Sequence, residues 1–169
     1  MSYIIKLEGG VPQIVADERI VIRTIETVEM TSIERAILPF SHFQTLEGDE
    51  ASKVRAVWIS PDDDFESQVP RLLGLELIAV DFPVFRDGRG YSVATLLRSR
   101  YGWRGELRAI GDVLRDQLNY MRRCGFDAFA VRADKDIHDA IKSFGHYSVR
   151  YQGAVDDPVP LFRRRGDRS

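Results

Sequence analysis

Along residues 54–145, short continuous apolar runs alternate with segments in which apolar residues recur every three to four positions. Four short apolar runs have the length and composition of strands: 54–60, 75–81, 106–111 and 127–132. The segments between and after these runs repeat apolar residues every three to four positions, as one face of a helix does. Helices are predicted over four such segments: 62–74, 91–101, 113–124 and 135–144. Alternating strand and helix signals on this scale predict consecutive βα units and a parallel sheet.

The first fifty residues follow a different pattern. YIIKL and QIVADERIVI flank Gly9 and Gly10, which predicts short antiparallel strands joined by a tight turn. Thr31 and Glu34 match a capping box that opens a short helix ending before Pro39. The polar stretch HFQTLEGDEASK is expected to be a loop. The predicted fold class is α/β, with a mainly parallel sheet of about four strands built from consecutive βα units and a short antiparallel N-terminal lead-in.

A chain of 169 residues favours one domain. We predict a single α/β domain over 1–150, with the lead-in at 1–30 and the βα units at 54–145. Residues 151–169 are rich in proline and charge and are predicted to form a surface tail, for which solvation is preferred to nucleic-acid binding. Because no apolar run reaches the ~20 residues of a membrane span and no secretory signal is recognised, a cytoplasmic protein without a membrane partner is expected.

Cysteine and histidine are scarce. Cys124 is the single cysteine, and the three histidines are scattered, so neither an internal disulfide nor a zinc cluster is expected. A metal would need oxygen ligands, which leaves Mg²⁺ open. The glycine patterns of nucleotide-binding loops are missing, and no motif for NAD, flavin, haem or an iron–sulfur cluster is present. The sequence therefore leaves open whether the protein is an enzyme.

The charges are unevenly distributed. Residues 1–84 contain 7 basic and 15 acidic residues, whereas residues 85–169 contain 17 basic and 11 acidic ones. Every basic residue between Phe85 and Gly125 is an arginine. Arginine has the planar fork that binds carboxylate, phosphate or sulfur oxyanions, so this bias is compatible with an anion site. The alternative is a general bias in codon usage, because arginine outnumbers lysine twenty to four along the whole chain.

Aspartates follow three successive predicted strands. In parallel sheets ligands bind beyond the carboxyl ends of the strands, where Asp81, Asp112 and Asp134 are expected. One interpretation is a carboxylate cluster for Mg²⁺. The interpretation we prefer for Asp112 and Asp134 is that each caps the helix that follows it. Because Phe82 and Pro83 follow Asp81, no helix begins there, and we predict that Asp81 contacts a ligand or holds an arginine.

The segment DGRGY (87–91) carries glycines on both sides of Arg89. This arrangement lets the backbone approach a ligand closely while the guanidinium projects from it. Asp87, Gly90 and Tyr91 are predicted to belong to the same anion-binding loop, with backbone amides near Tyr91 facing the ligand. An equally acceptable alternative is a glycine-rich turn closed by contact between Asp87 and Arg89.

Two polar residues lie within otherwise apolar elements. Arg108 alternates with Leu107 in a predicted strand, so it should face the other side of the sheet and should be paired. Asp81 or Asp112 are the partners we expect for it. Gln117 lies among apolar residues of the next helix and is retained as a candidate for ligand contact.

The segments DFPVFRDGRGYS and LLRSRYGWRGELRAIGDVLRDQLNYMRRCGFDAF carry a family resemblance. They resemble a bacterial family of unknown function whose genes lie beside sulfite reductase and that is often labelled "oxidoreductase probably involved in sulfite reduction". The resemblance is close over roughly residues 75–130 and implies a role in sulfur assimilation, with sulfite reductase as a partner. The matching blocks include the candidates given above: Asp81, Asp87, Gly88, Arg89, Gly90, Tyr91, Arg108, Gly111, Asp112 and Gln117.

Three hypotheses follow for function. The leading one is an accessory protein of sulfite reduction that binds a small oxyanion or a sulfated or phosphorylated metabolite, with Arg89 and Arg108 binding charge and Asp81 and Asp112 orienting them. The second is a Mg²⁺-assisted lyase, isomerase or hydrolase that uses Asp81 and Asp112. The third is a non-catalytic module that docks on sulfite reductase through its basic half. A homo-oligomer is compatible with open sheet edges.

Overall fold

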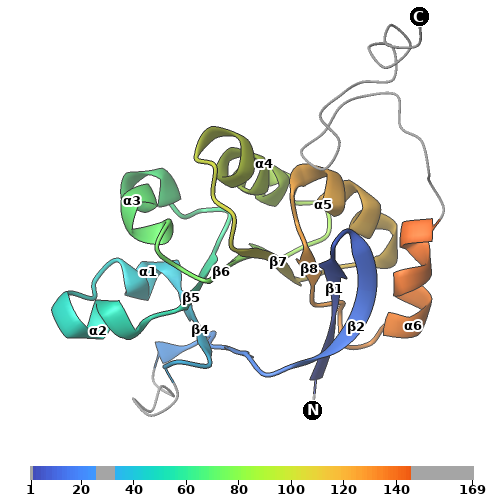
Figure 1. Ribbon diagram of the computed structural model, residues 1–169, viewed down its shortest axis with the longest axis horizontal. Helices are drawn as coiled ribbons and strands as arrows, with labels where there is room; N and C mark the ends of the chain where they lie inside the picture. Colours follow the sequence, from blue (N-terminus) through green and yellow to red (C-terminus); the bar gives the residue numbers. More distant parts are fainter. Residues whose placement is uncertain (1, 26–32, 146–169) are drawn as a thin grey trace, which may run out of the picture.

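One curled sheet of eight strands organises the protein, whose computed structural model describes residues 2–25 and 33–145. The strand order is β2-β1-β8-β7-β6-β5-β4-β3 (Figure 1). The strands have these bounds: β1 Ser2–Glu8, β2 Val11–Asp17, β3 Ile20–Val21, β4 Ala36–Pro39, β5 Ala56–Ile59, β6 Leu77–Phe82, β7 Glu106–Gly111 and β8 Ala128–Phe129. Neighbours from β3 to β8 are parallel, while β1 is antiparallel to both β8 and β2. The mainly parallel α/β fold and its antiparallel lead-in are confirmed, but the predicted number of about four strands is too small.

One strand that the pattern missed lies early in the chain. The predicted helix ending before Pro39 is wrong, because Ala36–Pro39 forms the fully buried strand β4; Thr31 lies outside the described residues. An apolar run of four residues is too short for its period to separate strand from helix, and here pairing with β3 and β5 decides. The polar stretch predicted as a loop contains the end of helix α1 (Phe40–Phe43) and helix α2 (Gly48–Lys53).

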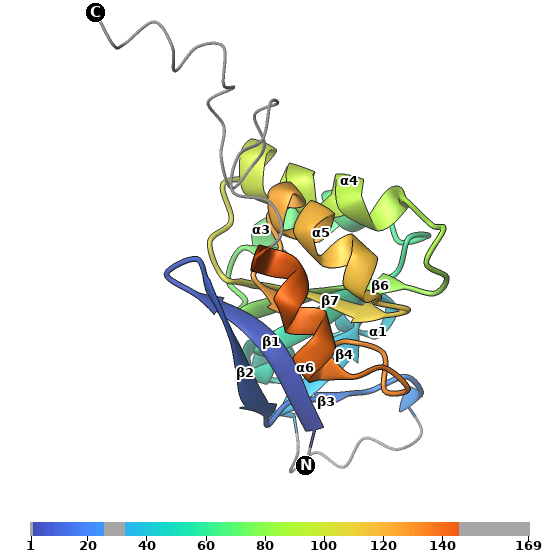
Figure 2. The same cartoon turned by 90° about the vertical axis from the view of Figure 1, so that its right-hand side faces the viewer.

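The helices lie along the outer, convex side of the sheet (Figures 1 and 2). The four predicted helical segments correspond to α3 (Val69–Leu72), α4 (Arg89–Thr95), α5 (Leu118–Cys124) and α6 (Ile137–Ala140), with α4 beginning two residues before the predicted 91–101. Each is joined to a 3-10 or π turn: Phe65–Gln68 precedes α3, Leu96–Arg100 follows α4, Arg115–Gln117 precedes α5 and Ile141–Gly145 follows α6. Among the described residues, no helix combines the length and apolarity needed to cross a bilayer.

Strand alternation divides the core into two parts. On β6, Ile78, Val80 and Phe82 belong to the large core beneath the helices, whereas Leu77 and Ala79 belong to a smaller cluster on the concave side. Ile37, Ala56 and Ile110 complete the buried residues of the smaller cluster. Because side chains alternate along a strand, Asp81 and Arg108 also lie on the concave side.

The connection between β2 and β3 shows how strongly the sheet curls. These strands form its two opposite edges, yet only Glu18 and Arg19 separate them in the sequence. Three Cα–Cα steps of about 3.8 Å cannot span more than about 11 Å, so the two edges must approach each other at this point. The result is a curled half-barrel in which the carboxyl ends of the six parallel strands lie along one rim, as in α/β barrels.

Candidate functional site

A pocket of about 530 Å³ opens at the carboxyl-end rim of the sheet. It is lined by Arg23, Asp81, Phe82, Pro83, Gly111, Asp112 and Arg132. Of the predicted candidates, Asp81, Gly111 and Asp112 are brought together here. The two arginines beside them were not among the candidates: Arg23 lies in the lead-in and Arg132 follows the short strand β8.

Asp81 holds Arg23. Its Oδ2 lies 2.9 Å from Arg23 Nη1, and the residue is 7% exposed at the end of β6. The Arg23 guanidinium also stacks over the Trp58 ring, with 5.0 Å to its centroid, while Trp58 Nε1 donates to the Ile22 carbonyl at 2.9 Å. The backbone after β3 and the guanidinium are therefore both fixed against β5 and β6.

Asp112 holds Arg132. Its Oδ1 accepts from Arg132 Nη1 at 2.7 Å, and Asp134 accepts from Arg132 Nε and Nη2 at 2.6 and 2.9 Å. Hydrogen bonds from Arg132 lower the pKa of Asp112 and lower the pKa of Asp134 to about 2. The same contacts raise the pKa of Arg132, so the arginine and both aspartates remain ionised.

The prediction that Asp112 and Asp134 cap helices is wrong. The helix cap before α6 is Asp136, whose Oδ1 accepts from the His138 amide at 2.8 Å. Leu114 occupies the cap position before the 3-10 turn that leads into α5. Both helical segments begin two residues later than the capping interpretation required, which leaves Asp112 and Asp134 to hold Arg132.

Gly111 gives the rim its tight turn. It has a φ of +90°, which L side chains rarely adopt, and a Cβ there would lie 2.5 Å from the Phe82 carbonyl oxygen. The same Cβ would lie 2.7 Å from Asp81 Oδ1, which is buried and has no hydrogen-bond partner among the described residues. Glycine therefore allows the backbone at the end of β7 to turn while in close contact with Asp81.

The Asp87–Arg89 segment lies apart from this pocket. Asp87 accepts from Arg89 Nε and Nη2 at 3.0 and 2.7 Å, and Asp62 accepts from Arg89 Nη1 at 2.6 Å. The contact between Asp87 and Arg89 that the alternative interpretation predicted is present. Its hydrogen bonds lower the pKa of Asp87.

Gly90 and Tyr91 pack against the sheet. A Cβ on Gly90 would lie 2.7 Å from Phe82 Cζ, so glycine allows α4 to approach β6 closely. The Tyr91 ring centroid is 5.1 Å from that of Phe82, and the Tyr91 amide donates to the Gly88 carbonyl at 3.2 Å. This amide is thus engaged within the turn rather than presented to the pocket.

Gln117 and Asp112 together fix the loop that follows β6. Gln117 Nε2 donates to the Phe85 carbonyl at 2.7 Å, and Asp112 Oδ2 accepts from the Phe85 amide at 2.8 Å. Gln117 Oε1 also accepts from the Leu114 amide at 3.2 Å. Gln117 supports the pocket through this loop and does not line it.

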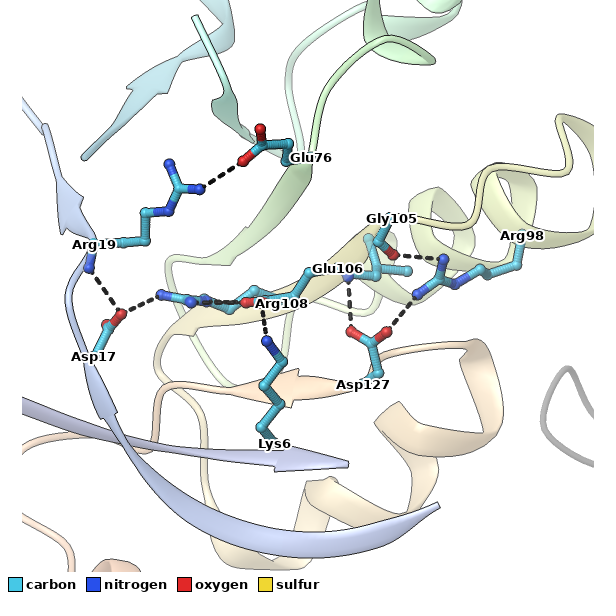
Figure 3. A network of polar contacts seen from close by, with 10 residues as sticks. Lys6, Asp17, Arg19, Glu76, Arg98, Gly105, Glu106, Arg108 and Asp127 are labelled. Carbon is cyan, nitrogen blue, oxygen red and sulfur yellow. Dashed lines mark hydrogen bonds and ion pairs between the residues drawn. The ribbon is translucent and has the colours of Figure 1, made fainter. Parts of the chain in front are cut away.

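Arg108 faces the concave side, opposite to Leu107, as predicted, but its expected partners are wrong. Arg108 Nη1 lies 2.9 Å from Asp17 Oδ1 and its Nη2 lies 2.7 Å from Glu106 Oε1 (Figure 3). It pairs in register with Ala79, two residues before Asp81, so the rim aspartates lie farther along the strands. The Asp17 carboxylate comes from β2, which no local pattern in the sequence connects with β7.

The described residues contain no group of three or more His, Cys, Asp or Glu side chains that could hold a metal ion. Asp81 and Asp112 share the pocket, but both oxygens of Asp112 already accept hydrogen bonds. The Mg²⁺ hypothesis therefore depends on two carboxylates, each of which pairs with an arginine.

The fold and this pocket define an α/β protein with a curled, mainly parallel sheet and a charged pocket at the carboxyl-end rim. The model of a family described as "Bacterial protein of unknown function (DUF934)" matches residues 56–162, and the chain belongs to this family. No curated protein matches the chain. No solved structure matches it either.

Proposed function

We propose that the rim pocket binds a small oxyanion through Arg23 and Arg132. The observation that carries this proposal is that both guanidiniums in the pocket are held by carboxylates, so their orientation is set before a ligand arrives. A guanidinium has five N–H donors, and the contact with Asp81 uses one of those on Arg23. The remaining donors can bind an anion.

The charge of the pocket favours an oxyanion that retains a proton. Among the lining residues Arg23 and Arg132 are balanced by Asp81 and Asp112, and Arg132 also pairs with Asp134, so a dianion would meet no excess of positive charge. A singly charged oxyanion with a hydroxyl group can accept hydrogen bonds from the arginines and donate one to a carboxylate. Hydrogen sulfite and dihydrogen phosphate both have this form.

We further propose that the protein acts in sulfur assimilation as an accessory to sulfite reduction. The resemblance noted for residues 75–130 supports this role by association. In sulfite reduction, sulfite is the small oxyanion that the rim pocket would bind. In this proposal, sulfite reductase is the protein partner. The sequence alone assigns binding of the anion's charge to Arg89 and Arg108. We now assign it to Arg23 and Arg132, because these two arginines lie beside Asp81 and Asp112.

Thermal shift at fixed ionic strength tests the proposal with sulfite, sulfate, phosphate and magnesium. A ligand at 100 times its Kd should stabilise the fold by about 2.7 kcal/mol, a rise in Tm of roughly 5–10 °C at this size. We expect sulfite or phosphate to raise the Tm of the natural chain and Arg132→Ala to abolish the rise. Arg89→Ala is the matched control, because Arg89 also pairs with two aspartates but does not line the pocket.

Other outcomes would favour the alternatives. If Arg132→Ala and Arg89→Ala reduced the rise in Tm equally, the stabilisation would be an effect of general surface charge, and the proposed site would be contradicted. A rise with magnesium alone that disappears in Asp81→Asn would favour the Mg²⁺-assisted enzyme. If none of these compounds changed the Tm and the immobilised chain retained sulfite reductase, the docking module would be favoured.

A further inference from the structure

The rim pocket is much larger than a bare oxyanion. Its volume is about 530 Å³, whereas a small oxyanion displaces roughly the volume of two or three water molecules, less than about 100 Å³. Pockets that enclose whole organic ligands have volumes of about 300–1,000 Å³. The charged side chains of the lining therefore account for only one part of a ligand that fits this space.

An apolar edge extends outward from the pocket. Pro83 lines the pocket, and Val84 and Phe85 follow it in the loop between β6 and α4. All three residues are exposed, Val84 by 55% and Phe85 by 45%. Consecutive apolar residues that face water are unfavourable unless they serve a function, so this run indicates a binding surface.

Hydrogen bonds hold this apolar edge in place. The Phe85 amide donates to Asp112 Oδ2 at 2.8 Å, and the Phe85 carbonyl accepts from Gln117 Nε2 at 2.7 Å. The Val84 carbonyl accepts from the Asp87 amide at 3.0 Å. Because the backbone is fixed on both sides of the Phe85 side chain, the exposure of this ring is built into the loop.

The Phe85 ring stands beside the pocket as a stacking surface. Asp112, which accepts from the Phe85 amide, also lines the pocket. The Arg86 guanidinium lies over the ring, 5.3 Å from its centroid, and helps to orient it. An aromatic ring that is fixed in this way can pack against a planar group of a ligand without losing much conformational freedom.

We propose that the ligand of the rim pocket is an organic oxyanion with a planar apolar group, and that Phe85 selects this group by packing against it. The inference rests on the proposed function, in which Arg23 and Arg132 bind the oxyanion end. Pro83 and Val84 add apolar contact beside the ring. The arginines thus recognise the charge, and the apolar edge distinguishes an organic ligand from an inorganic ion.

Isothermal titration calorimetry of the full chain with methylphosphonate and phenylphosphonate tests this inference. The two compounds have the same head group, and a buffer acidic enough to keep one proton on it leaves the organic group as the difference between them. We expect phenylphosphonate to bind the natural chain at least about tenfold more tightly. Phe85→Ala should reduce the affinity for phenylphosphonate to that for methylphosphonate and leave the latter unchanged. Phe85→Tyr should keep the preference, because the ring remains.

Leu73→Ala is the matched control. Leu73 is 44% exposed, close to the value for Phe85, but it precedes the start of β6, whereas the rim pocket lies at the end of this strand. This variant should bind both phosphonates as the natural chain does. Arg132→Ala should weaken both by the same factor, because both use the oxyanion end of the pocket.

Four results would overturn the inference. They are equal affinity of the natural chain for the two phosphonates, an undiminished preference in Phe85→Ala, the same loss of preference in Leu73→Ala, and a loss of methylphosphonate binding in Phe85→Ala, which would show that Phe85 only supports the loop. If sulfite or phosphate binds through Arg132 while the two phosphonates bind equally, the proposed function stands and only the organic ligand is wrong. If no anion depends on Arg132, the proposed function itself fails.

Discussion

Individual charged residues on the concave side are stabilised by partners that come from distant parts of the chain. Arg108 is 3% exposed and reaches Asp17, 91 positions earlier, as well as its neighbour Glu106. Asp81 pairs with Arg23 in the same way. The sequence predicted that Arg108 would need a partner, because it lies in an apolar strand, and that Asp81 would contact a ligand or hold an arginine. It could not show which partners, because those depend on the curl of the sheet.

Removing the Arg108 side chain should destabilise the fold strongly. Arg108→Ala leaves Asp17 without its buried partner and removes one of the two cations that contact Glu106. Breaking a buried ion pair on one side costs about 3–5 kcal/mol. Urea unfolding measures the loss. Arg55→Ala serves as control, since Arg55 is exposed and 3.9 Å from Glu76, and it should cost about 0–1 kcal/mol. Similar losses in the two variants would contradict this account.

At the scale of elements, long apolar runs were predicted best. The strands β5, β6 and β7 lie where the apolar runs predicted them, since each run is long enough to be buried on both faces. In contrast, β8 covers only Ala128–Phe129 of the run predicted at 127–132. Strand β3 is equally short, and β4 was taken for a helix. The short strands β3, β4 and β8 owe their state to the neighbours with which they pair, and those neighbours are remote in the sequence.

The turn that ends β7 should tolerate no side chain. Gly111→Ala introduces a left-handed backbone strain of about 1–2 kcal/mol and a collision with the Phe82 carbonyl worth about 1–3 kcal/mol more. Gly102 is the matched control, because its φ is +65° and nothing lies within 4 Å of an added Cβ. We expect Gly111→Ala to lose roughly 2–5 kcal/mol in urea unfolding and Gly102→Ala only about 1–2 kcal/mol. Equal losses would show that the collision is relieved at little cost.

For the whole molecule, a charged network joins the N-terminal hairpin to the parallel strands. Lys6 from β1 contacts Glu106 at 2.8 Å, and Asp17 from β2 contacts Arg108 at 2.9 Å (Figure 3). Two residues after Asp17, Arg19 reaches Glu76, which immediately precedes β6, at 3.0 Å. These contacts hold the hairpin across the concave side at the point where the edges of the sheet approach each other. The closure of the half-barrel therefore depends on ionised groups as well as on strand pairing.

This dependence predicts a loss of stability in acid. Burial acts to raise the pKa of Glu106, but the charge of Arg108 and hydrogen bonds from Lys6 and Arg108 outweigh it and hold the pKa below the usual 4.5. Because the unfolded chain binds this proton at higher pH, the contribution of Glu106 is complete above about pH 4.5 and is lost as the pH falls through the folded pKa.

Urea unfolding of the natural chain and Glu106→Gln between about pH 7 and pH 3 measures this contribution. The natural chain should be the more stable at neutral pH, and the difference should shrink in acid, because both chains then carry an uncharged group at this position. Asp127 is present in both chains; its pKa is raised mainly by burial, which is common to both, and to a lesser extent by the charge of Glu106, which only the natural chain has. Glu76→Gln is the control, since Glu76 is exposed and contacts Arg19. A difference between the natural chain and Glu106→Gln that stays constant with pH would show that Glu106 acts through packing rather than through its charge.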